Sequence, residues 1–206
     1  MPKTSCRFGF NARKNVPLED SIRWAADHDF WYVDFNADDP ANAYDSFDAA
    51  RVRTVCDLCQ STGVQIGIHT SSAVNMAEVT PVMARAADEY LQANIRLAKL
   101  LGCGWVVAHG GYHFSSDLNL RWQAAIQRLQ RAVGWAEAAG VPLWFENHNK
   151  EPEHAEIHYL PHTVEEFHWF WDAIDSPYFL WSFNVAHGHL VQIGRASCRE
   201  RVYVLV

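Results

Sequence analysis

The chain has 206 residues, of which 49% are hydrophobic and 13% aromatic, so it can bury a sizeable core and is not disordered, collagen-like or a coiled coil. Acidic side chains outnumber basic ones, 24 to 17, and this balance disfavours a nucleic-acid partner, because such binders neutralise phosphates with Lys and Arg. No apolar run is long enough to span a membrane, and the opening MPKTSCRFGF lacks the apolar stretch of a signal peptide. We therefore expect a cytoplasmic protein.

Short apolar runs alternate with longer amphipathic segments along the chain. The runs that predict β-strands span residues 6–12, 30–37, 64–70, 104–110, 141–148 and 179–186. The segments between them that predict helices span residues 17–28, 44–63, 80–102, 117–140 and 163–175. Gly63, Gly102 and Gly140 stand where helices should end, and Thr163 with Glu166 forms a capping-box pattern.

This alternation predicts βαβ crossovers and a mostly parallel sheet covered by helices. The turn after the first strand, GFNARKNVPLED, lacks the G-x-G-x-x-G pattern that cradles a dinucleotide. A barrel is therefore favoured over a doubly wound dinucleotide-binding sheet. We predict an α/β protein, an incomplete (β/α)8 TIM barrel with about six βα units and parallel strands.

The last residues differ in character from the rest of the chain. The segment QIGRASCRERV, which begins at Gln192, resembles the one-frame translation of a sequencing adapter. We therefore expect residues 1–191 to form a truncated TIM-barrel domain and residues 192–206 to be an artefactual tail. Without strands seven and eight, the first and sixth strands should present open sheet edges, which favour self-association.

Four of the six predicted strands place a metal-competent side chain at or just past the carboxyl end. These residues are His69, His109, Glu146 and His187. A single histidine at a strand end is commonly just a hydrogen-bonded structural residue, but the carboxyl ends of barrel strands converge on one face. The recurrence at equivalent positions therefore predicts a divalent metal site, and imidazole with carboxylate suits Zn, Mn, Fe or Co.

The order of motifs extends this prediction. The chain reads IHTSSAVNMAE, then LAKLLGCGWVVAHGG, then FENHN, then a strand that ends N-x-x-H. This order resembles the xylose isomerase-like TIM barrel superfamily, which includes sugar phosphate isomerases and epimerases and endonuclease IV-type apurinic endonucleases. The resemblance to the endonuclease-like members implies that His69, His109, Glu146 and His187 are metal ligands. In the isomerases and epimerases, the residue that matches Glu146 is both a metal ligand and the acid/base.

One position departs from the superfamily pattern. The sixth strand supplies Asn184 where members have an aspartate ligand. An amide oxygen can ligate a metal but brings no charge, which weakens a multinuclear site most, and Asn184 can equally be a polar core residue. The resemblance also implies further ligands from strands seven and eight, which this chain lacks, so we expect weak or incomplete metal binding and no turnover.

We predict a metal-dependent sugar or sugar-phosphate isomerase/epimerase with a small sugar or polyol as its substrate. Glu146 would move the proton next to the carbonyl and His187 would orient a substrate hydroxyl, making these the predicted catalytic residues. His113 and His148 are the predicted substrate contacts, and residues 151–162 are expected to form an exposed lid loop. The alternatives are an apurinic endonuclease-like phosphodiesterase and a non-catalytic TIM-barrel binding domain.

Overall fold

A computed structural model describes residues 7–190 together with the backbone of residues 202–203. The strands, in chain order, are β1 (Gly9–Asn11), β2 (Tyr32–Phe35), β3 (Gln65–His69), β4 (Trp105–Ala108), β5 (Tyr112–Phe114), β6 (Leu143–Glu146), β7 (Ile157–Tyr159), β8 (Phe179–Ser182) and β9 (Val202–Tyr203). The helices are α1 (Leu18–Asp27), α2 (Ala49–Thr62), α3 (Pro81–Leu101), α4 (Leu118–Ala139), α5 (Val164–Trp171) and α6 (Val185–Leu190), with 3-10 helices η1 (Pro40–Asn42) and η2 (Tyr44–Ser46).

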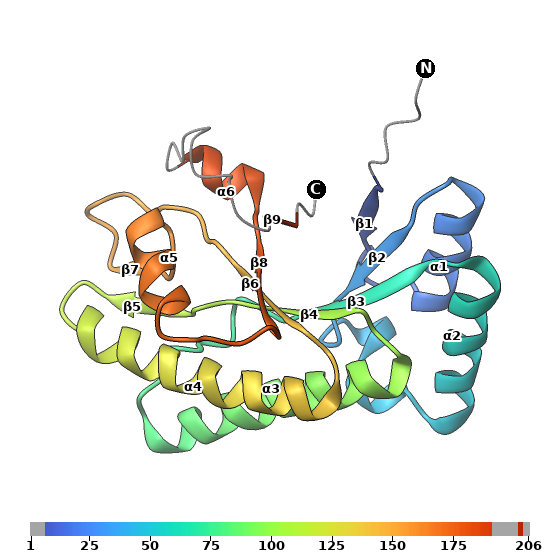
Figure 1. The fold of residues 1–206 in the computed structure, drawn as a ribbon, viewed down its shortest axis with the longest axis horizontal. Helices are drawn as coiled ribbons and strands as arrows, with labels where there is room; N and C mark the ends of the chain where they lie inside the picture. Colours follow the sequence, from blue (N-terminus) through green and yellow to red (C-terminus); the bar gives the residue numbers. More distant parts are fainter. Residues whose placement is uncertain (1–6, 191–201, 204–206) are drawn as a thin grey trace.

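One parallel sheet organises the molecule, in the order β1-β2-β3-β4-β6-β8-β9. Helices α1 to α4 lie along its outer side (Figure 1), and α3 packs on β3 and β4. Apolar side chains of strands and helices form one continuous buried core between these layers. The predicted α/β fold with parallel strands, a partial TIM barrel, is confirmed. None of the helices in the described part of the chain is both long and apolar enough to cross a membrane.

The predicted helix termini are also confirmed. Thr163 and Glu166 form both reciprocal bonds of a capping box at the start of α5. Gly63, Gly102 and Gly140 end α2, α3 and α4 with positive φ angles of 75°, 67° and 74°, a conformation that costs glycine little. Helix α2 is shorter than predicted and begins at Ala49, because the side chain of Asp48 accepts a backbone N–H at its first turn.

Two segments differ from the prediction. Within residues 151–162, β7 pairs antiparallel with β5 and forms a separate two-stranded ribbon instead of an exposed lid loop. The predicted strand 179–186 ends at Ser182, and α6 follows it. Strands of three residues carry too little periodicity to be recognised, and the partners of the ribbon are more than 40 residues apart in the sequence.

The edges of the sheet were expected to be open. Within the described residues, the outer edge of β1 has no ladder partner, whereas β8 pairs with β9 through Trp181 and Ser182. The predicted artefactual tail, residues 192–206, lies outside the described residues except for the backbone of β9. The expected self-association through open edges stays a prediction.

A glycine on β3 allows a side chain of β4 to reach across it to β2. Asp34 on β2, Gly67 on β3 and Trp105 on β4 lie in one row of the sheet. The indole Nε1 of Trp105 donates a hydrogen bond to Asp34 Oδ1 over a distance of 2.7 Å. A Cβ atom on Gly67 would overlap this indole, so the row requires a glycine at its centre.

We expect Gly67→Ala to lower the free energy of unfolding by about 1–3 kcal/mol, because the buried indole must shift. The matched control is Gly134→Ala on α4, where a Cβ meets nothing within 4 Å and should stabilise the helix by about 0.5–1 kcal/mol. Urea denaturation of both variants measures the difference. Equal effects of the two substitutions would contradict this role of Gly67.

Candidate metal centre

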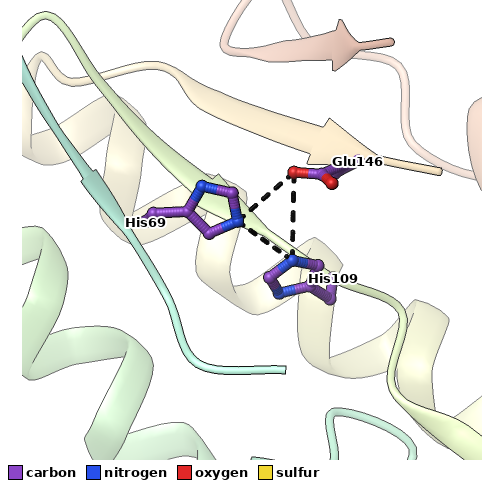
Figure 2. Close-up of side chains that lie close together, drawn as sticks. All are labelled: His69, His109 and Glu146. Atoms are coloured by element: carbon purple, nitrogen blue, oxygen red, sulfur yellow. Dashed lines mark hydrogen bonds and ion pairs between the residues drawn. The ribbon is translucent and has the colours of Figure 1, made fainter. Parts of the chain in front are cut away.

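Three of the predicted ligands meet at the carboxyl ends of adjacent strands. His69 is the last residue of β3, His109 follows β4, and Glu146 is the last residue of β6. His69 Nε2 lies 3.3 Å from His109 Nε2 and 3.3 Å from Glu146 Oε2, and His109 Nε2 lies 4.0 Å from the same oxygen. Figure 2 shows that the two rings and the carboxylate point toward one another.

The outer atoms of these side chains have protein partners. His69 Nδ1 lies 3.2 Å from Asp34 Oδ2. His109 Nδ1 lies 3.4 Å from Thr70 Oγ1, and Asn184 Nδ2 donates to Glu146 Oε1 over 2.8 Å. These contacts leave both Nε2 atoms and Oε2 directed at a common point. In metal sites, histidine ligands are commonly oriented in this way, by a partner on the other ring nitrogen. The donor set therefore fits a divalent ion held by two imidazoles and one carboxylate.

Burial and charge act in opposite directions on the two histidines. Burial lowers the pKa of His69, but the hydrogen bond and charge of Asp34, with the charge of Glu146, outweigh it and raise the pKa overall. Burial lowers the pKa of His109 well below its ordinary value, and the nearby imidazoles, first that of His148, lower it further. In the absence of a metal, His69 thus holds a proton more readily than His109 does.

Asn184 and His187 lie beside Glu146, on the side of its Oε1 atom. Asn184 Oδ1 accepts the backbone N–H of His187 over 3.1 Å. His187 Nδ1 lies 2.8 Å from the carbonyl of Asn147, which can only accept, so Nδ1 is the donor and Nε2 is left as an acceptor. Both residues line the cleft beside Glu146. His187 lies outside the group of three converging ligand atoms, and the side-chain oxygen of Asn184 is already engaged by the backbone of His187. Their predicted roles as ligands stay predictions.

The centre opens into a polar cleft of about 370 Å³. Besides the residues already placed, its lining includes Asn36, Thr70, Ser71, Ser72, His148, Asn149 and Tyr159. The ring of His148 is stacked on that of Tyr159 at 4.8 Å, and its Nε2 is buried without a hydrogen-bond partner among the described residues. Of the two predicted substrate contacts, the structure brings His148 into the cleft.

The other predicted contact lies elsewhere. His113 is buried in the β5–β7 ribbon, stacked on His158 with ring centroids 5.5 Å apart, and its Nδ1 is 2.8 Å from the carbonyl of Phe114. It is not among the residues that line the cleft.

Sequence reasoning missed Asp34 and Tyr159. An acidic residue inside the apolar run FWYVDFNA was a signal for Asp34, because a buried carboxylate requires partners.

Residues 22–201 match the protein family described as xylose isomerase-like TIM barrel. The chain belongs to this family. By contrast, no curated protein has a sequence that matches this chain.

Solved structures share the fold. A D-tagatose 3-epimerase-like protein superimposes with a TM-score of 0.78 at 20% identity, covering 97% of this chain and 75% of that one. D-allulose 3-epimerase from Methylomonas sp., in complex with D-allulose, gives 0.75 at 17% identity, covering 97% and 70%. Endonuclease IV from Thermus thermophilus gives 0.65 at 18% identity, covering 90% and 65%. At these identities the likeness establishes the fold.

We expect acid to destabilise the protein through His148. Burial, with the charges of His187 and His69, lowers the pKa of His148 to about 3, whereas an unfolded histidine titrates near about 6.5. Between these values the unfolded chain binds the extra proton, so the free energy of unfolding falls by up to about 1.4 kcal/mol per pH unit as the pH drops.

His148→Phe should reduce this slope, because it removes the titrating group and keeps an aromatic ring on Tyr159. Urea denaturation at a series of pH values below neutrality measures the slope. His154→Phe is the matched control, since His154 is exposed to water in the fold as it is in the unfolded chain. An unchanged slope in His148→Phe would show that this imidazole is not the source.

Proposed function

We propose that the cleft is the active site of a divalent-metal-dependent sugar or sugar-phosphate isomerase/epimerase, which transfers a proton next to a carbonyl. The observation that carries the proposal is the convergence of Glu146 Oε2 with His69 Nε2 and His109 Nε2 in the cleft. The hydroxyl and amide groups that line the rest of the cleft suit a substrate with many hydroxyls. D-allulose is the sugar bound to one protein of the same fold.

His69, His109 and Glu146 would hold the ion, which supplies a Lewis acid that polarises the substrate carbonyl. Glu146 takes the proton from the adjacent carbon, because its carboxylate is the one acidic group among the described residues that line the cleft. Asn184 keeps Glu146 Oε1 fixed by its N–H donor. His187 presents a bare Nε2 that accepts a hydrogen bond from a substrate hydroxyl.

An endonuclease IV-like phosphodiesterase is the second candidate. The pair His69 and His109 and the TM-score of 0.65 to endonuclease IV favour it. Two observations weigh against it. The described residues that line the cleft include no Lys or Arg to grip a phosphate backbone, and Asn184 supplies an amide where a multinuclear centre needs charge. A non-catalytic binding domain with the same fold is the third candidate.

We expect the purified chain to bind Zn²⁺, Mn²⁺ or Co²⁺ weakly, because one carboxylate is the only acidic donor of the group. His109→Gln should lower the affinity at least about tenfold, because replacing a residue that only supports a metal ligand already lowers metal affinity by about that factor. Binding should tighten as the pH rises through neutrality, because the raised pKa of His69 means that a proton competes for Nε2 and is released. Titration calorimetry in buffers of different ionisation enthalpy measures the affinity and the released proton. Binding that neither His109→Gln nor the pH alters would contradict this site.

We expect the metal-loaded chain to exchange the proton next to a ketose carbonyl with deuterium from heavy water, without forming the epimer, so that no sugar is converted, in keeping with the expected lack of turnover. Glu146 alone would remove and return the proton on the same face, whereas epimerisation needs a second group on the opposite face. Mass spectrometry of the recovered sugar measures the exchange, and chromatography measures the epimer. Glu146→Gln should abolish the exchange.

The matched control is Glu165→Gln on α5, an exposed residue whose loss should leave the exchange unchanged. Exchange that persists in Glu146→Gln would refute the assignment of the acid/base. Cleavage of a duplex that contains an abasic site, without any sugar exchange, would select the second candidate. Sugar binding without either reaction would select the third.

A further inference from the structure

Asp34 is a buried carboxylate that lies below the metal centre, outside the three converging ligands. It belongs to β2, and only 7% of its surface is exposed. Burying a carboxylate is unfavourable unless its oxygens are paired. Each oxygen of Asp34 has its own partner: Oδ1 accepts from Trp105 Nε1 at 2.7 Å, and Oδ2 lies 3.2 Å from His69 Nδ1.

The sheet fixes this arrangement. Trp105 reaches Asp34 across Gly67, the residue between them in the row of three strands. His69 is two residues after Gly67 on β3, so its side chain leaves the sheet on the same face. The indole of Trp105 is held in turn by stacking on Trp144, with ring centroids 4.8 Å apart and an angle of 15° between the planes.

These contacts determine which nitrogen of His69 carries the proton. The indole N–H can only donate, so it occupies Oδ1, and Oδ2 remains an acceptor for His69 Nδ1. With Nδ1 as the donor, the neutral ring keeps the lone pair of Nε2 free on the side of His109 and Glu146. We propose that Asp34, held by Trp105, is a positioning residue that fixes this tautomer and thereby makes His69 a metal donor. The inference rests on the proposed metal site.

The test is Asp34→Asn in the whole chain. The indole would keep the amide oxygen, so the amide nitrogen would face His69 and donate to Nδ1, and the imidazole proton would move to Nε2. We expect ¹⁵N-histidine NMR of the metal-free protein at alkaline pH to show the shifts of the two His69 nitrogens exchanged. The spectrum of His69→Gln identifies these signals. The affinity for Zn²⁺, measured by competition with a chromophoric chelator, should fall about 10–100-fold.

Asp20→Asn is the matched control, because Asp20 is an exposed residue of α1 that pairs with Arg23. It should change neither the His69 signals nor the affinity for Zn²⁺. Where Asp34→Asn does not fold, Trp105→Phe is the second variant, because it removes the N–H donor that holds Oδ1 and keeps an aromatic ring. The carboxylate can still only accept, so His69 should keep its proton on Nδ1, and the less firmly held carboxylate should give a smaller loss of affinity for Zn²⁺.

Unchanged His69 signals in folded Asp34→Asn would overturn the proposal, as would exchanged signals with unchanged affinity for Zn²⁺. An unchanged affinity in Trp105→Phe would also contradict it. Both measurements are independent of catalysis. If no sugar exchange is observed, the NMR and Zn²⁺ measurements still test the role of Asp34. If the role of Asp34 is contradicted, the exchange assay still tests the role of Glu146.

Discussion

Two imidazole nitrogens and a carboxylate oxygen face one another within 4.0 Å, and all three are acceptors when each imidazole is neutral and carries its proton on Nδ1. Acceptors at this distance repel one another unless a proton or a cation lies between them. The protein holds them there because each outer atom is engaged by another residue. The pKa of His69 is raised, against the effect of burial, first by Asp34 and then by the charge of Glu146. A proton on this ring relieves part of the repulsion, which a divalent ion would relieve more completely.

Buried strands hold these three side chains close together although their facing atoms repel one another. His69 and Glu146 end strands whose neighbouring residues are buried, and His109 follows a strand that is buried throughout. The β5–β7 ribbon adds a second support, because Tyr159 is stacked on His148, and the ring of His148 lies 4.7 Å from that of His109. The buried hydrophobic core and the ribbon thus hold together polar groups that repel one another when no proton or cation lies between them.

Most of the strands and helices, and the convergence of three side chains at one edge of the sheet, could be predicted because each leaves a local pattern. Apolar runs mark the strands, glycines mark the helix ends, and the parallel order of the strands brings His69, His109 and Glu146 to one edge of the sheet. The ribbon and the position of His113 could not be predicted, since they depend on pairing between two short segments far apart in the sequence. The role of Asp34 depends on the register of three strands, which the sequence does not specify.

Asn184 orients Glu146 without adding a charge to the centre, whereas an aspartate would add one. Its N–H group holds Glu146 Oε1 at 2.8 Å, and its own oxygen accepts the backbone N–H of His187. An aspartate would bring a second negative charge to Glu146 with no donor between the two carboxylates, and only a cation could hold them together. With the amide, the orientation of Glu146 does not depend on a bound ion. In the proposed enzyme, the centre would therefore give up affinity for the metal and keep the proposed proton-transfer group in one fixed orientation, with Oε1 held by the amide and Oε2 directed toward the imidazoles.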